Sequence, residues 1–219
     1  MNIWNKNTSR EFLDSCGLQH YKEGDMGCLY GYNFLHYGYP YEGCNVDYTD
    51  KGYNQIKYII ETIKHDPTSR RILFTSFNPS VVDEGCLWPC HSIVVQFYLE
   101  ADNKLSCQVY NRSQDMFLGC PFNIASAALQ LILFTELINN DLEYNGEKLT
   151  PGRLIMSLGD CHIYENHIEA VMEQINRRPY AFPKLVINKV FRSFDELNYE
   201  DITLVDYQCH DTIRAEMIA

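Results

Sequence analysis

The chain has 219 residues, a length that suits one domain with a substantial buried core. Its composition, 46% hydrophobic and 21% charged, is that of a folded globular protein and argues against general disorder. The formal net charge of −11 argues against a broad surface for polyanions, although a local arginine cluster could still hold one small anion.

The chain is expected to begin with a short helix at residues 7–15, followed by a loop with a short strand at residues 25–43. Residues 51–64 predict a helix, because isoleucines recur there at helical spacing. An Asp-Pro pair at residues 66–67 ends this helix. Residues 71–77 then have the composition of a strand.

A β-hairpin and a long helix are predicted for the middle of the chain. Residues 91–99 and 105–110 are strand-like and flank the turn Ala-Asp-Asn-Lys at residues 101–104. Residues 124–138 are apolar nearly all round a helix, which predicts a buried central helix with Pro121 in its first turn. This apolar run is too short to span a bilayer.

The last third is expected to contain a strand at residues 153–158, a helix at residues 163–177, and strands near Val186 and at residues 202–205. Strands mostly follow strands, with the helices separate from them. The pattern therefore predicts an α+β fold, in which a mixed β-sheet packs with helices around a long buried central helix. We expect residues 1–219 to form a single domain.

The nine cysteines indicate a reducing compartment, which we expect to be the cytoplasm. Their number is odd and the polar N-terminus does not read as a signal peptide, so a disulfide framework is not expected. The chain has no C-x-x-C pair and no H-E-x-x-H motif, so we expect no metal site. Most of the thiols should be buried as small apolar groups.

Cys90 is the candidate nucleophile. It is followed by His91, and a thiol becomes a useful nucleophile where nearby cations stabilise the thiolate. The sequence offers such cations at Arg70, Arg71 and Arg112. Taken alone, these residues have a simpler interpretation: adjacent strand residues point to opposite faces, and arginines are usually solvated surface charges.

Three further segments place polar groups near the ends of predicted elements. Residues 110–115, Tyr-Asn-Arg-Ser-Gln-Asp, combine a forked cation and a hydroxyl that suit a phosphate, or they form a turn with a surface ion pair. Residues 119–123, Gly-Cys-Pro-Phe-Asn, put an amide where it binds a ligand or caps the central helix. Residues 159–164, Gly-Asp-Cys-His-Ile-Tyr, put His and Tyr between a strand and a helix, where either can be structural.

In this order, the segments closely resemble those of thymidylate synthases, and the resemblance covers essentially the whole chain. Family members are homodimers that convert dUMP to dTMP, and 5,10-methylenetetrahydrofolate supplies both the carbon and the hydride. The likeness is carried by residues 89–91, 111–115, 118–124 and 159–167, and continues at residues 3–4, 24–27, 30–31, 66–72 and 182–185.

The resemblance implies a covalent mechanism in which Cys90 attacks C6 of the uracil. Arg112 and Ser113 match phosphate contacts from the same subunit, and Arg112 would also lie near Cys90 and favour its thiolate. Arg70 and Arg71 match a pair that reaches the phosphate from the partner subunit.

Further positions match contacts to the sugar, the reacting carbons and the base. His162 and Tyr164 match contacts to the deoxyribose hydroxyl, while Tyr30 and His91 match residues near the reacting carbons. Asn123 decides the base, because a carboxamide accepts from uracil N3–H and donates to O4, whereas cytosine presents the reverse pattern. Relatives that hydroxymethylate dCMP carry aspartate at this position, so Asn123 favours uracil.

The same resemblance implies a folate site and includes Gln114, next to Ser113, among the substrate-binding residues. The carboxylate of Asp115 matches a group that binds the pterin. The tail that closes over the ligands is matched by residues 216–219. Ile3, Trp4 and Leu118 match residues that form the walls of the folate site. Ile218, in the tail, matches a residue that makes a backbone contact.

One departure lies ahead of Ile3, where family members typically carry a longer segment with an arginine loop and a water-organising glutamate. Neither group has a matching position in this sequence. Three interpretations stay open: an incomplete reading frame, a piece completed by another polypeptide, and a divergent short enzyme. Two alternative functions also stay open: a hydroxymethylase for dUMP or dCMP, and a catalytically silent nucleotide-binding fragment.

Overall fold

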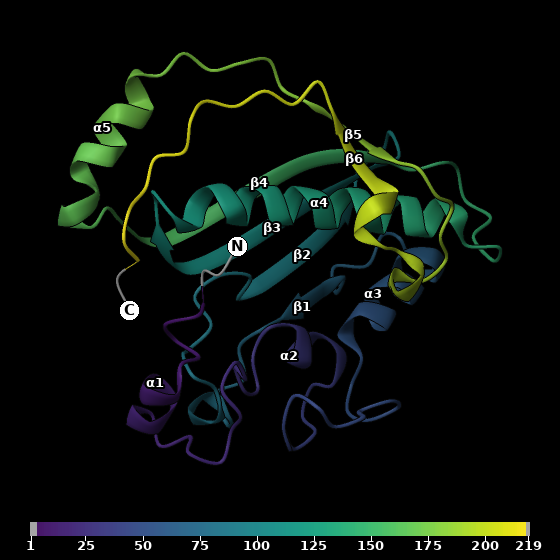
Figure 1. Ribbon diagram of the computed structural model, residues 1–219. Coiled ribbons are helices and arrows are strands. Elements are labelled where there is room, and N and C mark those ends of the chain that lie inside the picture. The colour runs from purple at the N-terminus through teal and green to yellow at the C-terminus, as the bar shows by residue number, and fades with distance from the viewer. Residues whose placement is uncertain (1–3, 218–219) are drawn as a thin grey trace.

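The computed structural model describes residues 4–217. Its centre is a four-stranded sheet in the order β1-β2-β3-β4, with α4 lying across one face (Figure 1). A second, two-stranded sheet pairs β5 with β6. The strands are β1 Leu73–Thr75, β2 Val94–Leu99, β3 Lys104–Asp115, β4 Thr150–His162, β5 Lys184–Ile187 and β6 Ile202–Val205. The helices are α1 Arg10–Ser15, α2 Gly31–Leu35, α3 Gln55–His65, α4 Gly119–Asn140 and α5 Ile168–Asn176. Short 3-10 turns are η1 Val82–Glu84, η2 Glu165–His167, η3 Phe194–Glu196 and η4 Tyr199–Asp201.

The central sheet is mixed, which confirms the predicted fold class. β1, β2 and β3 pair antiparallel, and the turn predicted at residues 101–104 joins β2 to β3. β3 and β4 pair parallel, with α4 as the crossover between them. The parallel ladder extends both strands beyond their predicted ends, as far as the pair Asp115–His162. The motifs at residues 110–115 and 159–162 therefore lie side by side on neighbouring strands.

The main core lies between the sheet and the helices α3 and α4. Its members are aliphatic and aromatic side chains from β1, β2, β3, α3 and α4, and Phe97 packs on Phe134 with ring centroids 4.9 Å apart. By length and composition α4 could cross a membrane, but its buried residues belong to this core. Residues 127–140 of α4 are all buried or half-buried, as the sequence predicted, whereas the first turns of the helix are open: Phe122 and Ile124 are 42% and 46% exposed.

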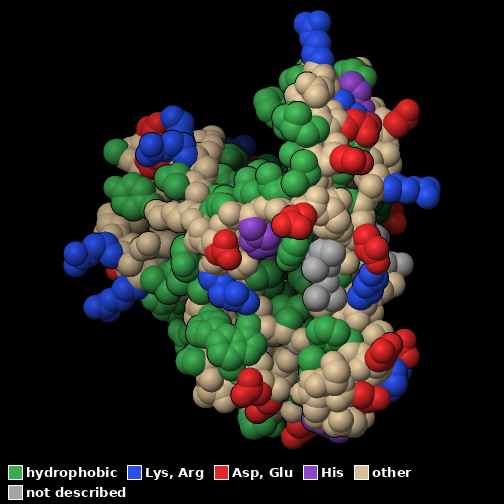
Figure 2. Space-filling view, turned by 90° about the vertical axis from the view of Figure 1, so that its left-hand side faces the viewer, with side chains coloured by type: hydrophobic (Ala, Val, Ile, Leu, Met, Phe, Trp, Pro, Cys, Tyr) green, Lys and Arg blue, Asp and Glu red, His purple; other side chains and the backbone are tan. Residues whose placement is uncertain are grey.

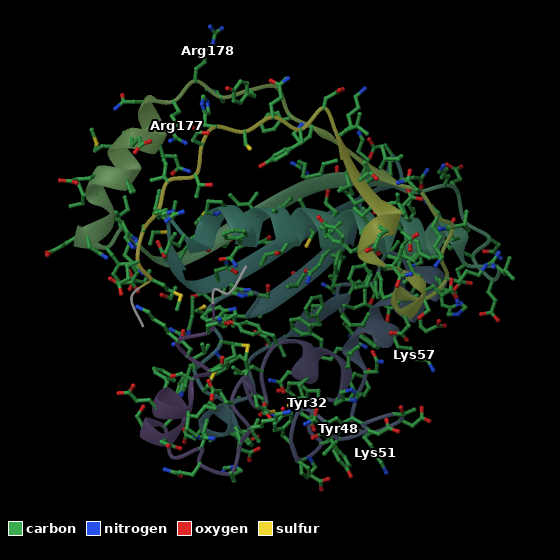
Figure 3. All side chains as sticks on the ribbon, in the orientation of Figure 1. Tyr32, Tyr48, Lys51, Lys57, Arg177 and Arg178 are labelled. Atoms are coloured by element: carbon green, nitrogen blue, oxygen red, sulfur yellow. The ribbon has the colours of Figure 1, made fainter. Side chains whose placement is uncertain are left out.

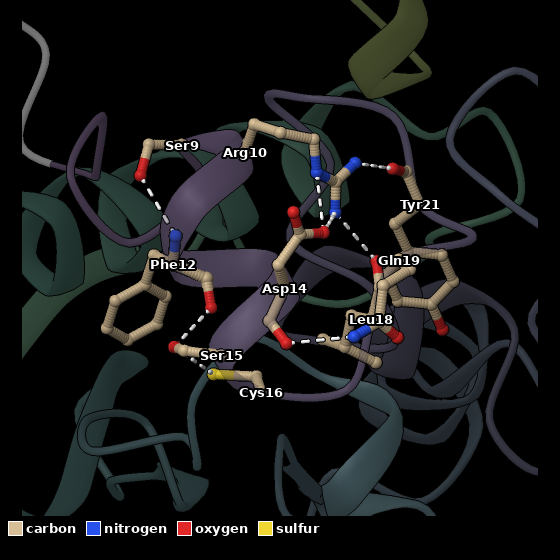
Figure 4. Close-up of polar contacts among 9 residues, drawn as sticks. All are labelled: Ser9, Arg10, Phe12, Asp14, Ser15, Cys16, Leu18, Gln19 and Tyr21. Carbon is tan, nitrogen blue, oxygen red and sulfur yellow. Dashed lines mark hydrogen bonds and ion pairs between the residues drawn. The ribbon is translucent and has the colours of Figure 1, made fainter.

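α1 begins at a polar cap and is held to the loop that follows it (Figure 4). The Ser9 hydroxyl accepts a hydrogen bond from the Phe12 amide, the usual arrangement at a helix N-terminus. Arg10 pairs with Asp14 and donates to the carbonyls of Leu18 and Tyr21. These contacts fix the entry to residues 25–43, which were predicted as loop and short strand but contain the short helix α2.

α5 and two extended segments form an arch over α4 (Figure 1). The segments run beside each other, because Arg177 donates to the Asp211 carbonyl at 2.5 Å and His210 donates to the Arg178 carbonyl at 2.8 Å. No residue of α5 is buried, although its sequence is amphipathic. Figure 2 shows hydrophobic side chains exposed beneath this arch, and Figure 3 shows Arg178 pointing away from the molecule.

Candidate active site

Cys90 and Tyr30 form the centre of the candidate site. Cys90 lies on the segment between η1 and β2 and is partly exposed. The Tyr30 hydroxyl lies 3.4 Å from the Cys90 sulfur and accepts the Cys90 amide at 3.1 Å. Because the hydroxyl oxygen is occupied as the acceptor, its single proton remains available for the sulfur or a ligand. Burial, followed by the nearby Cys90, raises the pKa of Tyr30, so this residue keeps its proton at neutral pH.

The backbone of Tyr30 has a φ of 38°, a strained value for a residue with a side chain. The His91 ring stacks on the Tyr30 ring with centroids 4.4 Å apart and planes 13° from parallel. Nδ1 of His91 also lies 3.2 Å from the Ser92 hydroxyl. Burial lowers the pKa of His91 to about 4, so the imidazole is neutral at pH 7 and supplies no cation to Cys90.

Arg112 connects β3 to the segment that carries Cys90. Its guanidinium donates to the carbonyls of Pro89 at 2.8 Å and Trp88 at 3.0 Å. The backbone amides of Arg112 and Ser113 both point at the Cys90 carbonyl, at 3.0 and 3.3 Å. The two motifs that the sequence singled out separately are therefore joined by four hydrogen bonds, and the Arg112 side chain remains partly exposed.

The end of β3 meets the end of β4 at the start of α4. Asp115 lies opposite His162 in the ladder, and one of its carboxylate oxygens accepts the amides of Phe117 and Leu118 at 2.9 and 3.2 Å. The ring of His162 packs edge-on against Tyr164, with centroids 5.0 Å apart. Nδ1 of His162 is buried, makes no hydrogen bond among residues 4–217, and lies 3.8 Å from a carboxylate oxygen of Asp160.

Near the start of α4, the side-chain amides of Asn123, Gln114 and Asn111 are hydrogen-bonded in series. Asn123 accepts a hydrogen bond from Gln114 at 2.9 Å, and Gln114 accepts one from Asn111 at 2.7 Å. Asn111 and Gln114 are 0% and 1% exposed. Asn111 was assigned no role from the sequence, although it lies within the motif at residues 110–115. Gln114 was expected among the substrate-binding residues.

Arg70 and Arg71 are not brought to Cys90 within one chain. Both are exposed and precede β1, and their carbonyls accept hydrogen bonds from Gln96 and Tyr58. The antiparallel register places β1 residues 73–75 against β2 residues 96–94, so the two arginines lie beyond the Gln96 end. Cys90 precedes the opposite end of β2, and the expectation that the arginines serve another subunit stays a prediction.

Two of the predicted folate residues lie in the described part. Trp4 is half-buried and its carbonyl accepts both the amide and the hydroxyl of Thr8, at 3.1 and 3.0 Å. Leu118 is half-buried at the N-terminus of α4. Ile3 and Ile218 lie outside the described residues.

Glu216, the first residue of the expected tail, is held by His167 and Lys6, to which the sequence assigned no role. The fully buried His167 donates from Nε2 to the Glu216 carbonyl at 2.7 Å, and Lys6 pairs with the Glu216 carboxylate at 2.6 Å. Tyr164 and Phe117 pack against the His167 ring. His167 ends the motif at residues 159–167, so its position in that motif was the available signal.

Comparisons with known proteins identify the family. Residues 1–219 match the family model for thymidylate synthase. The chain is 45% identical over 215 residues to a thymidylate synthase of Human herpesvirus 8 type P, and 41% identical over 223 residues to one of Saccharomyces cerevisiae. It is 43% identical over 218 residues to a bifunctional dihydrofolate reductase-thymidylate synthase of Leishmania major.

These alignments cover 98%, 98% and 99% of this chain, respectively. They cover 60%, 70% and 40% of the three relatives, so the chain spans only part of their length. The chain belongs to the thymidylate synthase family.

Proposed function

We propose that the protein catalyses the reductive methylation of dUMP to dTMP, with Cys90 as the nucleophile. The observation that carries this proposal is the arrangement of Cys90 against the neutral Tyr30 hydroxyl, on a segment held by Arg112. The folate cosubstrate supplies the one-carbon unit and the hydride, and it leaves as dihydrofolate. We also propose that residues 1–219 act as one catalytic domain in the cytoplasm, which the nine free cysteines within residues 4–217 support.

The protein's residues divide the work of binding and bond formation. Cys90 adds its sulfur to C6 of the uracil, and its release from C6 restores the ring at the end of the reaction. Arg112 and Ser113 suit a phosphate, because a guanidinium and a hydroxyl donate to its oxygens. His162 and Tyr164 would hold the deoxyribose, and their rings pack edge-on against each other at the ends of β4 and the segment that follows it.

Trp4, Leu118 and Asp115 each have a chemistry that suits a pterin ring. Trp4 and Leu118 are half-buried and offer apolar surface, while the carboxylate of Asp115 can accept from ring N–H groups. One Asp115 oxygen is occupied by the amides of Phe117 and Leu118, which fixes the carboxylate and leaves its second oxygen for a ligand. The residues present therefore fit the cosubstrate.

The proposal includes a homodimer with shared sites. The sheet face opposite α4 exposes large side chains: Tyr98 is 64%, Tyr110 42% and Ile155 44% exposed. An apolar patch of this kind on a regular surface is typical of an interface, and a two-fold axis would bring the same patch of two chains together. Arg70 and Arg71, exposed and away from Cys90 in their own chain, are available to a neighbouring site.

A covalent complex tests the assignment of Cys90. Incubation with 5-fluoro-dUMP and 5,10-methylenetetrahydrofolate should give an adduct on Cys90 that denaturing mass spectrometry detects. Cys90→Ser should form no adduct and show no turnover, while dUMP affinity stays within about tenfold, because a serine hydroxyl without a base is a poor nucleophile. The exposed Cys209→Ser serves as the matched control and should behave like the parent protein.

The products separate this reaction from its alternatives. Stoichiometric dihydrofolate indicates methylation, because a hydroxymethylase traps the carbon with water and releases tetrahydrofolate. Nucleotide binding without any adduct would instead support a silent binding protein. An adduct that persists in Cys90→Ser would show that another group starts the reaction.

A further inference from the structure

Asn111, Gln114 and Asn123 form a hydrogen-bonded series that we call the amide triad. Asn111 donates from Nδ2 to Gln114 Oε1 at 2.7 Å, and Gln114 donates from Nε2 to Asn123 Oδ1 at 2.9 Å. Asn111 Oδ1 accepts the backbone amide of Ser92 at 2.8 Å, which closes the other end of the series. Asn111 and Gln114 are almost completely buried, so water does not compete for these bonds.

The direction of the series follows from its fixed end. A backbone N–H can only donate, so the Asn111 oxygen must face Ser92 and the Asn111 NH₂ must face Gln114. The Gln114 oxygen is then the acceptor, and its NH₂ must face Asn123. Gln114 Nε2 also donates to the Asp115 carbonyl at 3.2 Å, a second acceptor that requires the same orientation.

We propose that the amide triad fixes the orientation of Asn123 and thereby sets base choice, with Gln114 as the positioning residue. This inference rests on the proposed function. With Oδ1 held toward Gln114, Asn123 keeps the NH₂ group and the second oxygen lone pair for a ligand. An NH₂ donor beside an oxygen acceptor complements O4 and N3–H of uracil.

Cytosine would require the Asn123 amide to turn over. The turned amide would place its NH₂ against the Gln114 NH₂, two donors without an acceptor in a buried place. Gln114 cannot turn to relieve this contact without losing its bonds to Asn111 and to the Asp115 carbonyl. The Gln114 side chain also has little free space around it, because even a methyl group added at Gly119 would lie only 3.3 Å from Gln114 Nε2.

Isosteric variants at Gln114 test the inference. Gln114→Glu replaces the donor that faces Asn123 by an acceptor, so Asn123 should turn and offer its oxygen outward. We expect the ratio of dUMP to dCMP affinity to fall about tenfold or more once the pH is high enough to ionise the buried glutamate, and Gln114→Met to give a smaller fall. Gln174→Glu, at an exposed glutamine of α5, is the matched control and should keep the parental ratio.

Calorimetric titration of both nucleotides into all four proteins gives these ratios, and circular dichroism establishes that each variant is folded. A ratio that stays within about twofold of the parent in folded Gln114→Glu and Gln114→Met would overturn the inference. Parental protein that binds neither nucleotide, or both equally, would instead contradict the proposed base choice.

Neutron diffraction on the ligand-free parent tests the orientations of the three side-chain amides independently of any nucleotide. Deuterons on Gln114 Nε2 pointing at Asn123 Oδ1 support the inference. Deuterons of Asn123 pointing at Gln114 overturn it, whatever the protein binds.

Discussion

At the scale of single residues, the environment of Cys90 depends on two aromatic neighbours. Tyr30 contacts both its amide and its sulfur, and His91 covers the Tyr30 ring. The stack supports Tyr30 in its unusual backbone conformation, since strained residues persist where their surroundings over-determine them. The thiol is therefore placed by a hydroxyl whose own position is fixed by packing.

Removing the Tyr30 hydroxyl should slow the covalent step. Tyr30→Phe keeps the ring and its stack but leaves the Cys90 amide and sulfur without this partner, and we expect adduct formation with 5-fluoro-dUMP to slow about 10- to 100-fold. Rapid-quench kinetics with mass detection measures the rate. Tyr199→Phe, at a tyrosine that is 88% exposed, is the control. A Tyr30→Phe rate within about twofold of the parent would contradict the assignment.

His91 makes stability depend on acid pH. Its folded pKa of about 4 lies below the unfolded value near 6.5, so the unfolded chain binds the extra proton between these values. Stability is therefore complete above about pH 6.5 and decreases as the pH falls toward 4. We expect His91→Asn to lose less free energy of unfolding between pH 6.5 and 4.5 than the parent, by about 1–2 kcal/mol given its partial exposure.

Urea denaturation at the two pH values measures this difference. The exposed His20→Asn is the control and should follow the parent. An identical loss in His91→Asn and the parent would mean that His91 is not held neutral by burial.

At the scale of an element, the loop that leads to Tyr30 is organised by Asp25. This carboxylate, 2% exposed, accepts the Gly27 amide at 2.8 Å, the Tyr41 hydroxyl at 2.6 Å and the Cys44 amide at 3.0 Å. Burial raises the pKa of Asp25, but hydrogen bonds from Tyr41, Gly27 and Cys44 hold it below its usual value. The loop also contains packed tyrosines, of which Figure 3 labels Tyr32 and Tyr48.

Neutralising Asp25 should loosen this loop. Asp25→Asn replaces one acceptor oxygen by an NH₂ donor. One of the three groups that donate to Asp25 would then face another donor and lose its hydrogen bond. We expect this to lower the free energy of unfolding by about 2–3 kcal/mol at pH 7. Because the folded pKa is lowered, this stabilisation is present above the unfolded pKa and disappears as the pH falls through the folded one. Urea unfolding of Asp25→Asn and of the exposed control Asp211→Asn at pH 7 measures the loss, and equal stability would refute this role.

At the scale of the whole molecule, each site is expected to need two chains. Cys90→Ala and Arg71→Ala proteins should each be inactive or nearly so. After the two proteins are unfolded and refolded as an equal mixture, about half of the dimers should contain one chain of each kind. In such a dimer, one of the two sites has both Cys90 and Arg71 intact. About a quarter of all sites should therefore recover activity. Steady-state dihydrofolate production measures the recovery.

Two controls make this experiment decisive. A mixture of Cys90→Ala with Cys90→Ser should recover nothing, and Arg178→Ala, at an exposed arginine of the arch, should keep parental activity. No recovery in the first mixture, with subunit exchange verified by native mass spectrometry, would rule out a shared site.

Local elements were the most predictable part of the fold. Residues 202–205, the hairpin turn at residues 101–104 and the helix around residues 55–64 depend on spacing and turn chemistry, and all three are present. β3 and β4 were predicted too short, because their last pairs form in a parallel ladder between segments far apart in the chain. The exposure of α5 and of the first turns of α4 was not predicted, since burial depends on which surfaces meet.

The family, the candidate nucleophile and the motifs around it were predictable from the sequence, because these depend on residue types in a fixed order. The orientations of these groups depend on tertiary contacts: the Tyr30 hydroxyl on Cys90, Arg112 on the carbonyls of residues 88 and 89, and the amide of Asn123. A side-chain amide has two nearly equivalent orientations, and the one it adopts depends on donors and acceptors from distant parts of the chain. For Asn123 that donor is Gln114, whose direction is set in turn by the Ser92 amide.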